Sequence, residues 1–424
     1  MRPYKVLLFI AVVMAILGTL YWAFPDVKLD LLAFHSHTSD LVVQEDTIAE
    51  FPVFEEQDTT PHPLTPNPLT PQPLIPKVSV DSTTDSRVFL QSFYASLPQA
   101  GERVVRVLHY GDSQIEEDRI TMQIRERLQQ QYGGRGVGLM PLVQTIPTRT
   151  VRQELRMNGH FVTPQQGPRR YIVYGFKRDQ LANGLYGPMG QLSMLNDSLV
   201  SGSEEVTAIC KPQVSTARYD TWRVFADSTI HSTFSGDTVQ LSGRGAVYAL
   251  SQQSETGVIV DNIPMRGCIG TVFTKMDSTQ LSTFYREQNV RLIILQYGGN
   301  AIPSNQNPGT IAAIVKGLRQ QVQYLRTCAP EASILFIGPS DMLTQIDGEW
   351  TTYPMVPYMD RLLRKMALEE NIAYFSLYRW MGGSGSMNRW REVGLAGNDG
   401  VHFTRAGARK AGNAIVEWIL SGTY

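Results

Sequence analysis

The chain has 424 residues, of which 42% are hydrophobic and 18% charged, so its length and composition predict folded domains with sizeable hydrophobic cores. A formal net charge of −1 at pH 7 argues against a nucleic-acid-binding protein, which needs a clustered basic face. The 3 cysteines allow at most one disulfide, which excludes a fold built on a disulfide framework.

Residues 1–24 predict a signal-anchor helix in the inner membrane. Arg2 and Lys5 precede residues 6–24, which carry no charge and are long enough to span a bilayer. Basic residues before such a segment predict a cytoplasmic N-terminus. A cleaved signal peptide is the alternative. Both interpretations export the rest of the chain, either as an anchored periplasmic body or as a secreted protein.

Residues 25–82 predict an extracytoplasmic linker. Within it, residues 61–76 repeat the pattern Pro-x-Pro-Leu. Proline fixes φ and removes a hydrogen-bond donor, so this stretch favours an extended polyproline II conformation. We expect it to hold the folded body away from the membrane. A ligand for a proline-recognition module is the alternative.

The folded body begins at residue 83. Apolar residues at helical spacing over residues 85–97 precede a predicted strand at 103–110. An amphipathic helix is predicted at 114–134, where two glycines end it. Residues 83–139 therefore predict the first part of an α/β domain.

Residues 140–256 have a different pattern. Short β-like runs alternate there with turns rich in Gly, Ser, Asp and Pro. The clearest runs are residues 169–176, 220–228, 237–243 and 245–251. This region predicts a β-rich insertion with a sandwich-like fold.

Residues 257–424 return to alternating strands and helices and predict the second part of the α/β domain. The predicted strands are residues 257–263, 290–299, 332–339 and 373–380, and the predicted helices are residues 308–329, 356–372 and 405–422. Unbroken apolar strands that alternate with helices predict a parallel sheet covered on both faces. Ligands of such sheets bind beyond the carboxyl ends of the strands.

Ser113 follows the first predicted strand, in the stretch VLHYGDSQIEEDR. By itself it is better explained as a helix N-cap, because Ser is a preferred residue at that position. A nucleophilic serine also needs a base within hydrogen-bond reach and donors for the oxyanion. The rest of the chain decides whether these exist.

His402 is the candidate base. It lies in AGNDGVHFTRAG, directly before the last predicted helix, and Asp399 precedes it by 3 residues. A carboxylate at that position can orient the imidazole and stabilise its protonated form. The other histidines lie in the linker, in the insertion or, for His109, inside the first strand. A surface loop with turn-forming residues is the alternative interpretation of this segment.

Two further loops offer oxyanion donors. Asn300 follows an apolar strand in LQYGGNA, and its side-chain amide can donate a hydrogen bond to a developing negative charge. Gly270 lies in MRGCIGT after another strand, where a glycine lets a backbone N–H approach a substrate closely. Gly267 in the same loop is a competing choice. Each loop by itself could also be a simple turn.

The chain order of Ser, Gly, Asn and Asp-x-x-His resembles that of the SGNH/GDSL hydrolase superfamily, in the blocks GDSQ, GCIG, GGNA and DGVH. The resemblance implies a three-layer α/β/α, flavodoxin-like fold with the β-rich insertion. It implies a catalytic triad of Ser113, Asp399 and His402, with an oxyanion hole formed by Ser113, Gly270 and Asn300. Two residues depart from the family pattern. Gln114 follows the serine where the simplest pattern has Leu, and Ala301 follows the asparagine where an acidic residue often stands.

An exported member with an insertion between the first two blocks resembles the peptidoglycan O-acetylesterases, whose inserted module is similar to a carbohydrate-binding module. This resemblance implies a serine esterase that removes O-acetyl or similar small acyl groups from an O-acylated cell-envelope glycan. No metal or organic cofactor is expected. An O-acyltransferase that uses the same triad and a non-catalytic glycan-binding protein are the alternatives.

Overall fold

The computed structural model describes residues 85–422, except residues 143, 145, 158–159, 162–168, 173–190 and 196–205. The expected membrane anchor and proline-rich linker lie outside the described residues. Within the described part of the chain, no helix combines the length and the apolar character that a bilayer crossing requires.

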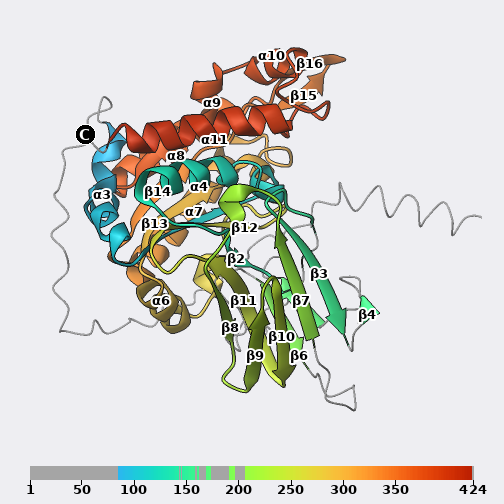
Figure 1. The fold of residues 1–424 in the computed structure, drawn as a ribbon. Coiled ribbons are helices and arrows are strands. Elements are labelled where there is room, and N and C mark those ends of the chain that lie inside the picture. The colour runs from blue at the N-terminus through green and yellow to red at the C-terminus, as the bar shows by residue number, and fades with distance from the viewer. Residues whose placement is uncertain are drawn as a thin grey trace, which may run out of the picture. The chain divides into compact units, whose positions relative to one another are not determined.

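The centre of the α/β domain is a parallel sheet with the strand order β12-β1-β13-β14-β17 (Figure 1). All neighbouring strands in it pair in parallel. The strands are β1 (Val104–Gly111), β12 (Gly257–Pro264), β13 (Val290–Gln296), β14 (Ser333–Ile337) and β17 (Ala373–Phe375). The predicted parallel sheet is confirmed.

Helices cover both faces of this sheet, as Figure 1 shows. Alternate residues of a strand point to opposite faces, so Val107 of β1 joins one hydrophobic core and Leu108 the other. One core receives side chains from α3 (Gln91–Ser96), α4 (Thr121–Tyr132) and α11 (Arg405–Leu420), and the other from α6 (Ser278–Glu287), α7 (Pro308–Cys328) and α8 (Val356–Glu369). The three-layer α/β/α fold is confirmed.

The β-rich region consists of two antiparallel sheets in its described residues. One has the order β4-β3-β7-β10-β9; the other has the order β2-β11-β6-β5, with β8 paired to β11. The strands are β2 (Gly138–Met140), β3 (Val151–Met157), β4 (His160–Phe161), β5 (Arg169–Ile172), β6 (Gln191–Leu195), β7 (Val206–Pro212), β8 (Thr221–Ala226), β9 (Ile230–Ser235), β10 (Thr238–Gly243) and β11 (Gly245–Gln253). Leu241 of one sheet and Leu250 of the other share a hydrophobic core, as in a sandwich.

A buried polar network joins the two regions. Arg106 of β1 forms an ion pair with Asp261 of β12 at 2.8 Å, and both side chains are 0% exposed. Asp261 also accepts the backbone N–H of Leu139 in β2, at 2.7 Å. Arg106 donates to the Gln253 side chain in β11. The central sheet is therefore connected to the β-rich region through groups that water does not reach.

Three predicted elements were wrong in detail. The segment predicted as one helix at 114–134 is a 3-10 helix, η3 (Ser113–Asp118), followed by α4, because Glu117 and Asp118 have φ values of 58° and 61°. Residues 85–97 form η1 (Ser86–Leu90), α3 and the start of η2 (Leu97–Gly101). The strand predicted at 373–380 ends at Phe375.

After Phe375 the chain turns into α9 (Leu377–Met381). The Ser376 hydroxyl accepts the backbone N–H of Arg379 at 3.1 Å and caps this helix. The structure also contains α10 (Ser386–Glu392) and a hairpin of β15 (Leu343–Ile346) and β16 (Glu349–Thr352), which the sequence did not predict. These elements extend the loops that follow β14 and β17.

Candidate active site

The turn after β1 presents Ser113 without using it as a helix cap. Asp112 is the N-cap of η3, and its Oδ1 accepts the backbone N–H of Gln114 at 2.9 Å. The Ser113 hydroxyl instead lies 2.8 Å from Nε2 of His402. The capping role that Ser113 could have filled is therefore taken by its neighbour.

Ser113, His402 and Asp399 form a continuous hydrogen-bonded line. Nδ1 of His402 lies 2.7 Å from Oδ2 of Asp399. The second carboxylate oxygen, Oδ1, accepts the backbone N–H groups of Val401 at 2.9 Å and His402 at 3.0 Å. Ser113 and His402 lie 289 residues apart in the chain. The fold brings them together at the carboxyl edge of the sheet.

The Asp399 carboxylate is held in its charged form. Partial burial acts to raise its pKa, but the hydrogen bonds from the His402 ring and from two backbone N–H groups outweigh burial and lower the pKa to about 2. The carboxylate is therefore ionised at neutral pH, where it can orient the His402 ring and stabilise the imidazolium.

Asn300 lies at the same edge of the sheet, in η6 (Gly299–Ala301) after β13. Its Nδ2 donates to the carbonyl of Cys268 at 3.3 Å. An amide nitrogen carries two hydrogens, so a second one is available to an oxyanion. Ser113 and Asn300 line one small pocket, together with Asp112, Gln114, Gln296, Tyr297, Gly299, Pro339, Ser340, Met342 and Val401.

The loop after β12 carries both glycines that the sequence offered as oxyanion donors. The N–H of Gly270 points to Sγ of Cys268 at 3.3 Å, and a Cβ on Gly270 would meet the Tyr297 ring at 2.8 Å. Gly267 is exposed, has φ +70°, and has no described atom within 4 Å of its Cβ position. Gly270 is therefore packed against Tyr297, a residue of the pocket lining, whereas Gly267 lies at the surface.

Gln114 lies in the site, and the sequence did not predict its role. It was noted only as a departure from the Leu of the family pattern. Its Nε2 donates to the carbonyl of Val401 at 2.6 Å. Val401 directly precedes His402, so this bond ties the turn that carries the serine to the loop that carries the histidine. Within the described chain, the buried Oε1 of Gln114 has no hydrogen-bond partner.

His109 is a buried residue of β1, as its position in the strand predicted. Burial lowers its pKa to about 3, so the ring is neutral at physiological pH. Its Nε2 lies 3.1 Å from Oε1 of Gln296, and its Nδ1 lies 2.9 Å from the hydroxyl of Thr121. This network supports Gln296 beneath the pocket and leaves His402 as the histidine beside the serine.

Three cysteines lie among the described residues. All three cysteines are free and buried. Burial raises the pKa of the Cys268 thiol to about 12, so it remains protonated. No group of three or more His, Cys, Asp and Glu side chains within the described ranges is arranged to hold a metal ion.

The burial of the Asp112 carboxyl group makes the stability of the protein depend on pH. Burial raises its pKa to about 6, against an opposing hydrogen bond from the Gln114 N–H. The folded state therefore binds more protons than the unfolded state between pH 3.8 and about 6. The resulting stabilisation is complete below pH 3.8 and is lost as the pH rises through the folded pKa.

We expect Asp112→Asn to be more stable than the native protein above pH 6, by at most roughly 3 kcal/mol, because a neutral amide carries no buried charge. The asparagine can still accept the capping hydrogen bond. Urea unfolding of both proteins from pH 4 to pH 8 measures the difference. A stability difference that does not grow with pH would show that the Asp112 charge is solvated in the folded state.

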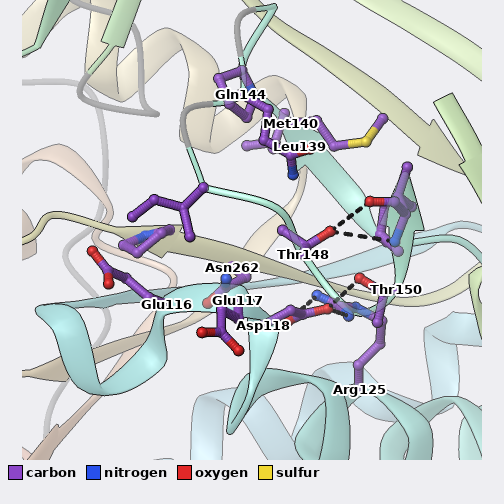
Figure 2. A pocket seen from close by; sticks show the side chains of 15 residues that line it. Glu116, Glu117, Asp118, Arg125, Leu139, Met140, Gln144, Thr148, Thr150 and Asn262 are labelled. Atoms are coloured by element: carbon purple, nitrogen blue, oxygen red, sulfur yellow. Dashed lines mark hydrogen bonds and ion pairs between the residues drawn. The ribbon is translucent and has the colours of Figure 1, made fainter. Parts of the chain in front are cut away.

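A second cavity lies beside the serine turn, between η3 and the segment that leads from β2 to β3 (Figure 2). Glu116, Glu117 and Asp118 face it, as Figure 2 shows. Positive φ values at two successive non-glycine residues cost about 1–2 kcal/mol each. Such strain persists where surrounding contacts hold the backbone in place.

Each of these three carboxylates pairs with an arginine from a different segment. Glu116 pairs with Arg266 of the glycine loop, Glu117 with Arg149, and Asp118 with Arg125 of α4. The Asp118 carboxylate also accepts the Thr150 hydroxyl at 2.8 Å. These ion pairs fix the strained turn that follows the serine.

Comparison with known proteins gives a match to a family model. Residues 224–410 match the model of the GDSL-like Lipase/Acylhydrolase family. This range contains Asn300, Asp399 and His402, whereas Ser113 precedes it and is joined to it by the hydrogen bond to His402. No curated protein matches the chain.

Comparison with solved structures finds one that shares this fold over most of both chains. A peptidoglycan O-acetylesterase aligns with a TM-score of 0.63 and 19% identity, over 81% of this chain and 97% of that one. Est24, a carbohydrate acetylesterase from Sinorhizobium meliloti, aligns with a TM-score of 0.29 and 16% identity, over 39% of this chain and 79% of its own. An acetyl xylan esterase aligns with a TM-score of 0.27 and 14% identity, over 39% and 80%.

The fold and the family match define a class. The chain has the three-layer fold of the SGNH hydrolases with an additional β-rich region, and its residues 224–410 match a GDSL-like acylhydrolase domain. The protein is a hydrolase of carboxylic esters.

Proposed function

We propose that this enzyme removes O-acetyl groups from a cell-envelope glycan such as peptidoglycan, through an acyl-serine intermediate. The observation that carries the proposal is the hydrogen-bonded line from Ser113 through His402 to Asp399 at the edge of a small pocket. The peptidoglycan O-acetylesterase that shares the fold over most of both chains supports the choice of substrate.

The proposed reaction begins with proton transfer from the Ser113 hydroxyl to Nε2 of His402. Ser113 Oγ then attacks the ester carbonyl, and the tetrahedral intermediate places a negative charge on the former carbonyl oxygen. Collapse of this intermediate releases the glycan hydroxyl, which takes the proton from His402. A water activated by His402 attacks the acetyl-serine and releases acetate. Asp399 keeps the His402 ring oriented throughout.

The oxyanion would be held by the Ser113 N–H, the Asn300 amide and an N–H of the glycine loop. For the glycine we propose Gly270, because it packs against Tyr297, which lines the pocket together with Ser113 and Asn300. Donors fixed before the reaction stabilise the developing charge without reorganisation. Cys268 positions Asn300 by accepting one of its hydrogens.

Asn300→Ala tests the side-chain donor. We expect kcat on a small acetyl ester to fall by roughly 10²–10³, because the lost hydrogen bond acts mainly in the transition state. KM should change little. Asn413→Ala, at an exposed position of α11, is the control. An unchanged kcat in Asn300→Ala would assign this asparagine to the turn alone.

Acetate release from a panel of O-acetylated glycans tests the proposed substrate. We expect peptidoglycan with native O-acetylation to release acetate, and xylan acetate to release it more slowly. Transfer of acetyl to an oligosaccharide acceptor is measured in the same reactions. Transfer in excess of release would establish an acyltransferase, and neither reaction on any glycan would contradict the proposed substrate class.

We also propose that the catalytic body works in the periplasm, anchored by residues 1–24 and held off the membrane by residues 25–82. The support is the uncharged N-terminal run after two basic residues and the proline-rich repeat that follows. Such a placement would bring the pocket within reach of envelope glycans.

A further inference from the structure

Two hydrogen bonds join the turn that carries Ser113 to the loop that carries His402. One is the bond between the Ser113 hydroxyl and Nε2 of His402, at 2.8 Å. The other runs from Nε2 of Gln114 to the carbonyl of Val401, at 2.6 Å. Each residue of the second pair is the chain neighbour of a residue of the first pair. The bond between serine and histidine is therefore accompanied by a second bond between the same two segments.

The peptide unit between Val401 and His402 is bound at both of its polar groups. Its N–H donates to Oδ1 of Asp399 at 3.0 Å, and its carbonyl accepts the amide of Gln114. Asp399 belongs to the same loop, whereas Gln114 belongs to the turn of the serine. The bond from Gln114 therefore fixes the backbone beside His402 relative to the serine.

The amide of Gln114 leaves its own oxygen without a partner when it makes this bond. A backbone carbonyl only accepts, so the NH₂ group of Gln114 faces Val401 and Oε1 faces elsewhere. Gln114 is 8% exposed, and its buried Oε1 has no hydrogen-bond partner within the described chain. A buried acceptor without a donor destabilises the folded state. The Leu of the simplest family pattern would carry no such cost, and a residue that lowers stability at a site is typically retained for function.

Acylation of Ser113 removes the first of the two bonds. In the proposed acyl-serine, Oγ is an ester oxygen and has no hydrogen to donate. Nε2 of His402 has given its proton to the leaving alcohol, and the other ring nitrogen stays directed at Asp399. The serine therefore no longer holds the ring during the step in which His402 activates water. The bond from Gln114 to Val401 is unaffected by acylation.

We propose that Gln114 is a positioning residue for deacylation, which holds His402 beside the acylated Ser113 through the carbonyl of Val401. This inference rests on the proposed acyl-serine mechanism. Gln114 lines the pocket but contacts no reacting atom in this role. The same bond is present during acylation, when the Ser113 hydroxyl also holds the ring. Deacylation should therefore depend on Gln114 more than acylation does.

Gln114→Leu removes both the donor and the unpaired oxygen. With 4-nitrophenyl acetate, whose good leaving group makes acylation fast, nitrophenol release should show a burst and then a slow steady phase. We expect the burst rate constant to stay within about threefold of the native value and kcat to fall about 10- to 100-fold, because a displaced His402 misaligns the attacking water. KM should fall with kcat, and mass spectrometry should find acetylated Ser113 in the steady state. The backbone bond from Leu343 to Gly400 remains and keeps the loop folded.

Gln129→Leu is the matched control. Gln129 is 7% exposed, and its Nε2 donates to the carbonyls of Gly136 at 3.1 Å and Val258 at 3.2 Å. It lies near the end of α4 and is not among the described residues that line the pocket of Ser113. We expect Gln129→Leu to lower the urea midpoint and keep both rate constants, whereas Gln114→Leu should keep or raise the midpoint and lower kcat. If Gln114→Leu does not fold, Gln114→Met, with an unbranched side chain, carries the test.

A native kcat in folded Gln114→Leu, an equal slowing of the burst and steady phases, or an equal loss of kcat in Gln129→Leu would overturn the inference. A urea midpoint of Gln114→Leu as low as that of Gln129→Leu would also overturn it, since the amide would then serve stability. Ser113→Ala is assayed beside them. Native activity in Ser113→Ala would contradict the acyl-serine mechanism itself. If Ser113→Ala is inactive while Gln114→Leu is native-like, only the positioning role is contradicted.

Discussion

Replacement of Ser113 with alanine is expected to abolish ester hydrolysis while leaving the protein as stable as before. The hydroxyl would supply the only covalent acceptor for the acyl group, and neither Asp399 nor His402 can substitute for it in the proposed step. Loss of a serine nucleophile in such a constellation lowers kcat by about 10⁶-fold in a serine protease. Residual turnover should be close to that of the uncatalysed reaction.

Stability separates the two interpretations of this serine. Removal of a serine N-cap costs about 1 kcal/mol. Asp112 already caps η3 through the Gln114 N–H, so Ser113→Ala should change the free energy of unfolding by less than about 0.5 kcal/mol. Acetate release and urea unfolding of the same preparation test both parts. Ser215→Ala, at an exposed position of the β-rich region, is the control for both.

Substantial hydrolysis by folded Ser113→Ala would rule out the acyl-serine mechanism. Loss of activity together with a loss of about 1 kcal/mol of stability would mean that the hydroxyl also contributes to the turn. A fluorophosphonate probe provides an independent measurement, because it should label the native protein and not the alanine variant.

Much of the α/β domain could be predicted from the sequence because its strands are buried on both faces. Such strands appear as unbroken apolar runs, and β1, β12, β13 and β14 end within a few residues of the predicted positions. The segment after β17 was predicted wrongly because Leu377 and Tyr378 continue the apolar run. The Ser376 cap decides the outcome there, and it acts through a single hydrogen bond.

The hydrogen-bonded triad could be proposed from sequence because each member lies beyond a predicted strand end. The sequence could not rank Gly267 and Gly270, since the packing of Gly270 against Tyr297 is a contact between two loops. The contacts of Gln114 and Arg266 were also beyond sequence reasoning. Val401 lies 287 residues from Gln114, and no local pattern encodes a contact over that separation.

The β-rich region was predicted only in outline for a related reason. Its strands bury only alternate residues, as in β7, where Val206, Ala208 and Cys210 are buried and the residues between them are not. Alternating patterns of this kind are weak, and the pairing of β2 with β11 joins segments far apart in the chain. The buried contacts that connect this region to the central sheet are therefore visible only in the structure.

The ion pair of Arg106 and Asp261 leads to the largest expected effect on stability. Both side chains are 0% exposed, so the desolvated guanidinium depends on this carboxylate and on Gln253. Asp261→Ala would leave the Arg106 charge buried without a counter-charge, at a cost of about 3–5 kcal/mol. The Leu139 N–H would lose its acceptor as well, which adds about 1–3 kcal/mol where water cannot enter.

Urea unfolding of Asp261→Ala at pH 7 measures this cost, with Asp220→Ala as the matched control. Asp220 also pairs with an arginine, Arg135, but the two side chains are 45% and 66% exposed, so its loss should cost no more than about 1 kcal/mol. Asp261→Asn keeps an acceptor for Leu139 and should lie between the two. An equal loss of unfolding free energy in Asp261→Ala and Asp220→Ala would mean that water reaches Arg106. The buried network would then not stabilise the connection between the central sheet and the β-rich region.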